Sequence, residues 1–219
     1  MISDALAALA QIFTPPFRGV LWKSLGLTLL LLVFAWVGLD KFITAYIAVP
    51  YPWLATTLAV LTGLGLVVGL AFLVAPVSAL VAGFFLDELA DVVEHEVSPK
   101  RIGKALPAGE AMRLAIGFAI ISIFVNFVAL VLLLVPGVNV VAFLVANAYL
   151  AGREYFELAA LRYAPLDEVR AMRREHGLYL FLCGLPIAAF LAVPVVNLLT
   201  PLFATAFMVR VHARLAGLR

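Results

Sequence analysis

The chain has 219 residues, of which 65% are hydrophobic and 13% charged, and its mean hydropathy is +1.14. A soluble domain contains about 45–50% apolar residues, so this chain has more apolar surface than it can bury in water, and we expect lipid to surround most of it. The net charge of +2 argues against nucleic acid as a partner, and the single cysteine, Cys183, excludes an internal disulfide.

The first thirteen residues predict a short amphipathic helix that lies along the membrane surface. Ile2, Leu6, Leu9 and Phe13 recur at helical spacing in a segment that is otherwise small or polar. No Lys or Arg precedes Arg18, whereas a secretory signal peptide begins with a basic region. We therefore expect this segment to be retained in the protein.

Two long helices are predicted over residues 15–97. Thr14 is the expected N-cap of the first helix, and Pro15 and Pro16 lie in its first turn, where proline is favoured. The second helix carries no charge over residues 54–86, roughly 50 Å at 1.5 Å per residue, against a bilayer core of about 30 Å. Both helices are long enough to cross a membrane.

Residues 110–163 and 177–215 each predict a helical hairpin around a Pro-x-x-Asn turn. The turn sequences, VPGVN and VPVVN, repeat with an offset of 58 residues. Each descending arm holds only about 15 apolar residues, or roughly 22 Å of helix, which is short for a complete crossing. Six full spans remain an alternative, because both arrangements place the hairpin ends on the same side. Arm length favours re-entrant hairpins.

The fold prediction is therefore an all-α, polytopic membrane protein in one membrane domain. It comprises two long transmembrane helices, two re-entrant (hemi-penetrating) hairpins and the N-terminal surface helix. Of the fifteen Lys and Arg residues, only Lys41 falls on the face opposite the hairpin ends. Because basic residues concentrate on the cytoplasmic side, we expect both termini to be cytoplasmic.

The sequence offers little to an enzyme. His95, His176 and His212 are far apart and fit no metal-ligand spacing, and no glycine-rich phosphate loop appears. No catalytic pair lies within an apolar segment, so an intramembrane hydrolase has the least support of the functions considered. We expect a protein that is not an enzyme, with no cofactor, no metal and no ATP-driven step.

Four asparagines within the hairpins are candidate pore residues, because polar groups in hydrocarbon need a partner or a wet cavity. For Asn126 and Asn147 the structural alternative is bonding to the helix backbone or to a neighbouring helix. Asn139 and Asn197 are the expected N-caps of the descending arms. Such helix starts carry partial positive charge and would meet an anion deep in the membrane.

A second anion site is expected at the start of the first long helix, where Arg18, Lys23 and the amides of the first turn would meet. The alternative is that these basic side chains reach lipid phosphates. Arg153 and Glu157, one helical turn apart, predict a structural ion pair at the hairpin base. Asp87 belongs to an acidic run at helical spacing that predicts a solvated, ion-paired helix end; its other members are Glu88, Asp91 and Glu94.

Four stretches together resemble the CysZ-type sulfate permeases: PPFRGVLWKSL, APVSALVAGFFLDEL, VPGVNVVAFLVANAYLAGREYFELAALR and VPVVNLLTPLFATAFMVRVH. The resemblance covers nearly the whole chain. It implies an oligomeric protein of the bacterial inner membrane that imports sulfate for cysteine biosynthesis without ATP. In that family a Gly-Leu-Arg stretch binds sulfate. Arg18 matches its arginine, Pro16 and Phe17 replace Gly-Leu, and Gly19 stands where a second arginine can occur.

We therefore predict a sulfate permease or channel that works as a homo-oligomer in the lipid bilayer. The predicted sulfate-binding residues are Phe17, Arg18, Gly19 and Lys23, and sulfite or another oxyanion is a possible substrate. Burying a dianion unassisted would cost on the order of tens of kcal/mol, so its path must be wet or lined with donors. The alternative function is a membrane-organising hairpin protein through which nothing passes.

Overall fold

The computed structural model describes residues 1–46, 56–57, 60, 63–64, 85–107, 109–110, 113, 116–117, 120–121, 124–125, 127–128 and 139–218. These residues form helices and connecting turns without any strand, which confirms the all-α class. Most of the second predicted long helix and the VPG part of the first hairpin turn lie outside the described residues. The number of spans and of re-entrant hairpins therefore stays a prediction.

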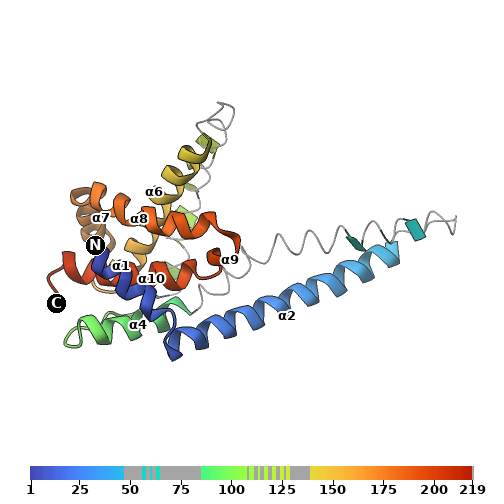
Figure 1. Ribbon diagram of the computed structural model, residues 1–219, viewed down its shortest axis with the longest axis horizontal. Helices are drawn as coiled ribbons and strands as arrows, with labels where there is room; N and C mark the ends of the chain where they lie inside the picture. Colours follow the sequence, from blue (N-terminus) through green and yellow to red (C-terminus); the bar gives the residue numbers. More distant parts are fainter. Residues whose placement is uncertain are drawn as a thin grey trace.

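Eight helices follow one another along the described chain (Figure 1). They are α1 (Ile2–Gln11), α2 (Pro15–Tyr46), α4 (Leu86–Val97), α6 (Asn139–Ala160), α7 (Leu166–Glu175), α8 (Gly177–Ala192), α9 (Pro194–Asn197) and α10 (Thr200–Leu215).

Helix α2 is the clearest membrane-crossing candidate. Over Pro15–Leu39 it is long and apolar enough to span a bilayer, and only 22% of its most apolar window is buried. After its first turns it extends away from the other described helices (Figure 1). The pair α7 and α8 passes the same test together, but the two helices are bent by 89°. The described residues thus contain one straight helix that could span a membrane.

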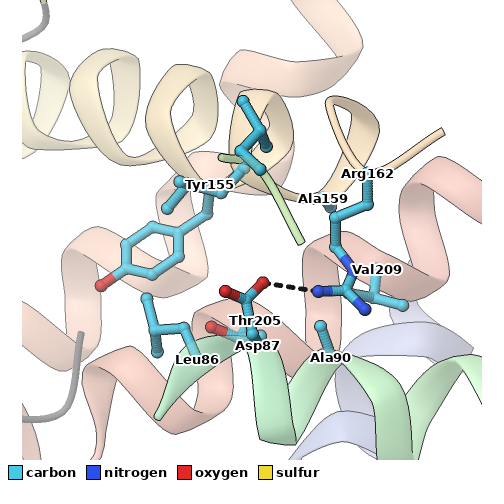
Figure 2. Close-up of a pocket in the computed structure, with 10 residues that line it drawn as sticks. Leu86, Asp87, Ala90, Tyr155, Ala159, Arg162, Thr205 and Val209 are labelled. Carbon is cyan, nitrogen blue, oxygen red and sulfur yellow. Dashed lines mark hydrogen bonds and ion pairs between the residues drawn. The ribbon is translucent and has the colours of Figure 1, made fainter. Parts of the chain in front are cut away.

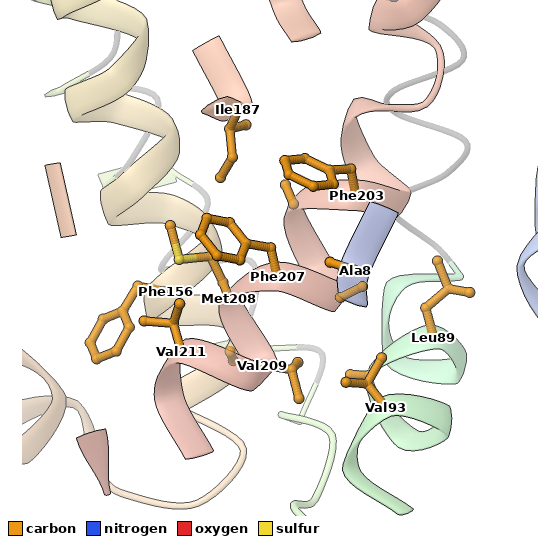
Figure 3. Packing of buried hydrophobic residues seen from close by; sticks show 14 of the residues in the cluster. Ala8, Leu89, Val93, Phe156, Ile187, Phe203, Phe207, Met208, Val209 and Val211 are labelled. Carbon is orange, nitrogen blue, oxygen red and sulfur yellow. The ribbon is translucent and has the colours of Figure 1, made fainter. Parts of the chain in front are cut away.

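Helix α10 forms the centre of the fold. Every residue from Thr200 to Ala213 is buried, and α1, α4, α6 and α8 pack around it. Figure 3 shows Phe203 and Phe207 among the side chains of this core, and the Phe203 ring stacks on that of Phe190 from α8, with centroids 4.3 Å apart. A helix that is buried on all sides needs no polar stripe. This explains why the sequence of α10 has no clear amphipathic period.

The second hairpin differs in detail from the prediction. Val193 is extended because it precedes Pro194, and the turn itself forms the short helix α9. The descending helix α10 begins at Thr200 and not directly after Asn197, the expected N-cap, since Pro201 supplies the favoured start one residue later. The expectation that the arm runs directly from the turn was therefore wrong.

Helices α6 and α8 cross with almost no side chain between them. A Cβ atom on Gly152 would lie 2.5 Å from the carbonyl oxygen of Leu180. A Cβ atom on Gly184 would lie 2.7 Å from the carbonyl carbon of Ala148 and nearer still to its oxygen. Small residues allow such backbone contact, which membrane helices use where water supplies no hydrophobic driving force between them.

Helix α1 faces the fold with its polar side. Asp4 and Gln11 are buried, at 3% and 7% exposure, whereas Ile2 and Leu6 are 72% and 62% exposed. Asp4 Oδ2 lies 2.7 Å from an Arg214 nitrogen of α10. A helix on a water-soluble protein turns its apolar side inward. The reversed polarity of α1 fits a helix whose outer side contacts lipid.

Candidate functional site

The start of α2 places Arg18 and its neighbours on different faces. The Arg18 side chain is exposed, while Phe17 is completely buried in the core and Gly19 has open space around its Cα. The Arg18 amide donates to the Thr14 carbonyl at 3.0 Å, and the two prolines before Phe17 have no N–H. The Phe17 amide is thus the one free donor of this turn, and an anion here would depend mainly on the Arg18 guanidinium.

Lys23 points to α4 rather than to Arg18. Its Nζ lies 3.4 Å from Glu88 Oε1 and 5.9 Å from the centre of the Phe85 ring. At 3.6 residues per turn, two side chains five residues apart project about 140° from each other. The structure therefore brings Lys23 to a carboxylate and separates it from Arg18.

A buried arginine organises the acidic face of α4. Arg162, just after α6, is 6% exposed, and its Nε donates to Glu94 at 2.7 Å. Its Nη1 donates to Asp87 at 2.5 Å and its Nη2 to Asp91 (Figure 2 draws the Asp87 pair). The three carboxylates are spaced by four and three residues, which places them on one helix face. With a second bond from Nη2 to Glu94 at 3.2 Å, four hydrogen bonds tie the guanidinium to α4.

Glu94 is the buried member of this cluster, with no exposed side-chain area. It also accepts the Gly103 amide at 2.9 Å, so it joins α4 to the following loop. Asp87 and Asp91 are 62% and 51% exposed. The prediction of a solvated helix end fits these two carboxylates, but it was wrong for Glu94, which packs inside the fold.

A cavity of about 170 Å³ adjoins the cluster. Asp87 and Arg162 contribute its charged wall, and Tyr155 and Thr205 line it from α6 and α10 (Figure 2). The Thr205 hydroxyl is buried and has no hydrogen-bond partner among the described residues. The cavity is large enough for several water molecules, and the Thr205 hydroxyl and the Asp87 carboxylate offer them partners.

Sequence reasoning missed Arg162. The acidic residues of α4 share one helix face, and such a face needs cations when it is buried, but sequence alone does not tell which of the fifteen basic residues meets it. Arg162 lies 68 residues from Glu94 along the chain. The two meet only because α4 and α6 both pack against α10.

The base of α6 carries a second arginine cluster. Arg153 Nε lies 3.3 Å from Glu157 Oε1, and Arg173 of α7 donates to the same oxygen. Burial lowers the pKa of Arg173, and the positive charge of Arg153 lowers it further. One carboxylate thus serves two arginines, and positive charge exceeds negative charge here.

The hairpin asparagines have ordinary roles where they are described. The Asn147 side-chain amide donates to the Phe143 carbonyl one turn earlier, at 2.8 Å. Asn197 accepts from the Thr200 hydroxyl at 3.3 Å, but α10 begins after Leu199 without any side-chain cap. The expectation that Asn197 caps the descending helix was wrong, because α9 intervenes. Asn126 and the side chain of Asn139, the first residue of α6, lie outside what the structure describes.

The histidines and acidic residues of the described part of the chain form no metal site. No group of three or more His, Cys, Asp or Glu side chains within them is arranged to hold a metal ion. His212 is buried beside Tyr163, with ring centroids 4.9 Å apart, and burial lowers its pKa to about 4. It is therefore neutral at physiological pH.

Comparison with known proteins places the chain in a family. Its residues 4–201 match the family model described as "Sulfate transporter CysZ/Etoposide-induced protein 2.4". A search of curated proteins finds no significant match. The match covers most of the chain, and together with the apolar span of α2 it indicates a membrane location. The chain belongs to the sulfate transporter CysZ/etoposide-induced protein 2.4 family.

Proposed function

We propose that the protein is a sulfate permease of the bacterial inner membrane that imports sulfate for cysteine biosynthesis without ATP. The observation that supports this best is the match of residues 4–201 to a family described as a sulfate transporter. An arginine that stays exposed at the start of a membrane-crossing helix supplies matching chemistry. Its guanidinium is always charged and offers planar paired donors to an oxyanion.

In this proposal Arg18 collects sulfate at the membrane surface. The buried Phe17 fixes the orientation of the first turn of α2, and Gly19 leaves space beside the arginine. Lys23 contributes long-range attraction, since its charge is partly offset by Glu88 at 3.4 Å. The same functional proposal retains Asn126, Asn139, Asn147 and Asn197 as residues that line the deeper part of the path.

The membrane arrangement is part of the same proposal. The ion pair between Asp4 of α1 and Arg214 of α10 holds the two ends of the chain together. Both termini therefore lie on one side of the membrane, and the positive-inside tendency makes that side the cytoplasm. Several copies assemble, with the exposed apolar face of α2 covered by lipid or by a neighbouring copy.

Sulfate flux into liposomes tests the function. Purified protein reconstituted without a nucleotide should carry radiolabelled sulfate inward faster than empty liposomes do. Arg18→Ala should lower the initial rate about tenfold at low sulfate, because it removes a charged hydrogen bond worth about 1.5–3 kcal/mol. Lys100→Ala, which removes an exposed cation in the turn after α4, is the matched control. Flux equal to that of empty liposomes would refute the permease proposal.

A membrane-organising role is the second candidate, favoured by the outward apolar side of α1. Such a helix inserts between lipid headgroups and can bend or scaffold the bilayer. Electron microscopy of the same liposomes separates the two candidates. Reshaped vesicles without sulfate flux would favour the organising role, whereas flux through vesicles of unchanged shape would favour the permease.

A further inference from the structure

A groove lies at the base of the first hairpin, on residues that the permease proposal does not use. It has a volume of about 480 Å³ and is formed by α6, by the start of α7 and by residues 113, 117 and 121. Arg113, Arg153 and Arg170 line it together with two carboxylates, Glu157 and Asp167. Three arginines from three separate segments thus face one space.

The carboxylates compensate this positive charge only in part. Glu157 is already shared between Arg153 of the groove and Arg173 beside it. Asp167 is 97% exposed and lies 3.9 Å from Arg170, too far for a hydrogen bond. Arg113 is exposed and makes no ion pair within the described part of the chain. Two carboxylates therefore face three guanidinium groups in the groove, and Arg173 beside it adds a fourth.

Arg173, which lies beside the groove, also has positive neighbours. Burial lowers its pKa, and the positive charges of Arg153 and Arg174 lower it further although Glu157 accepts its hydrogen bond. An arginine with a bound carboxylate and no excess of neighbouring cations would be stabilised in its charged form. An anion in the groove would relieve this repulsion.

The start of α7 adds donors on the same side. Leu166 and Asp167, its first two residues, line the groove, and no side chain caps this ten-residue helix. The first amides of a helix have no intrahelical partner and carry partial positive charge. Guanidinium groups and uncapped amides are both donor types that bind oxyanions in proteins.

We propose that this groove binds a tetrahedral oxyanion, either free sulfate or phosphate or the phosphate of an anionic lipid headgroup. Arg153, fixed by Glu157, presents its remaining donors, while Arg113 and Arg170 close on the anion from the two sides. Glu157 and Asp167 complete the charged part of the wall, and Gly117, Ile121 and Leu166 form the remainder. Basic pockets at the cytoplasmic ends of membrane helices bind lipid headgroups in this way. The proposal is independent of transport and of Arg18.

Titration of the purified full chain in detergent tests the groove. The probes are sodium sulfate, sodium phosphate and cardiolipin, the last added in micelles against a zwitterionic phosphatidylcholine background. Binding is read by calorimetry and by the thermal unfolding midpoint. Arg113→Ala and Arg170→Ala should each weaken binding about tenfold, since each removes charged hydrogen bonds. Both side chains are well exposed, so their loss should leave the unliganded midpoint unchanged.

Controls separate this site from the mouth of α2. Lys100→Ala removes an exposed positive charge outside both proposed sites and should leave the binding of every probe unchanged. Arg18→Ala should remove only sulfate binding at the mouth of α2, so phosphate and cardiolipin binding should stay as in the unaltered protein. Arg113→Lys and Arg170→Lys keep the charge but lose the planar donors, and they should weaken binding several-fold. These variants retain the net charge of the fold, so they decide the matter even if an alanine variant fails to purify.

The outcomes are distinct. Saturable binding of sulfate or phosphate that falls in the groove variants identifies a free oxyanion, and binding of cardiolipin alone identifies a lipid headgroup. No binding of any probe, or binding equally strong in both groove variants, overturns the proposal. If Arg18→Ala lowers sulfate flux while groove affinity is unchanged, oxyanion binding in the groove does not depend on transport through the Arg18 site.

Discussion

The crossing of α6 and α8 makes a sharp prediction for Gly184→Ala. The new Cβ atom would meet the Ala148 carbonyl group, its carbon at 2.7 Å, where ordinary contact begins at 3.4 Å. The helices must therefore separate by at least 0.7 Å. The obstacle is backbone, which cannot rotate away as a long side chain would.

The magnitude follows from two opposing effects. Overpacking a close contact costs about 1–3 kcal/mol, and a contact against backbone belongs at the upper end. Replacing glycine by alanine within a helix stabilises the folded state by about 1 kcal/mol, because less backbone entropy is lost on folding. The expected net loss is about 2 kcal/mol. Gly177→Ala, in the first turn of the same helix, meets nothing within 4 Å and should be neutral or slightly stabilising.

Thermal unfolding of the two variants in the same detergent measures the difference. A stability difference of about 2–3 kcal/mol between them corresponds to a midpoint difference of roughly 4–12 °C for a chain of this size. The reasoning fails if Gly184→Ala melts at the same temperature as Gly177→Ala. That result would mean that α6 and α8 do not touch through their backbones.

Two further predictions concern buried charge and pH. Glu94→Gln should lower the free energy of unfolding by about 3 kcal/mol, because it leaves buried Arg162 without its inner partner. Asp87→Asn, at an exposed carboxylate, should lower it by at most about 1 kcal/mol. Chemical denaturation of both variants measures the two losses. His212 should make the protein lose stability as pH falls from 6.5 to about 4, since the unfolded residue binds a proton that the folded residue refuses, while buried Glu154, whose pKa is raised to about 7, acts in the opposite direction. The loss is about 3 kcal/mol. It should vanish in His212→Phe and persist in the exposed His95→Gln; equal pH profiles for the two variants would contradict the assignment.

The sequence predicted the elements that depend on local patterns. The proline-started apolar run of α2 and the reversed hydrophobic pattern of α1 are both readable from neighbouring residues, because lipid selects apolar side chains outward. The Arg153–Glu157 contact follows from helical spacing alone. In each case the decisive information lies within one or two turns of a single helix.

The sequence did not predict what depends on packing between distant helices. The burial of α10 and the partnership of Glu94 with Arg162 require that several helices be placed relative to one another. Asn197 was misassigned because the proline-containing turn forms the short helix α9, and the next helix begins only at Thr200, with Pro201 in its first turn. Arg18 and Lys23 are only five residues apart in the sequence, but their side chains point about 140° away from each other around the helix axis.

The position of α10 has a consequence for biogenesis. Every helix that packs around α10 is synthesised before it. The core of the nascent protein therefore cannot be completed until the residues from Thr200 onward leave the ribosome. During that interval Glu94 and Arg162 can already pair, whereas Gln11 and Glu96 still await Arg210. A stalled or prematurely terminated translation product would therefore expose the surfaces of α1, α4, α6 and α8 that α10 otherwise buries. Chaperones and quality-control proteases recognise such exposed surfaces.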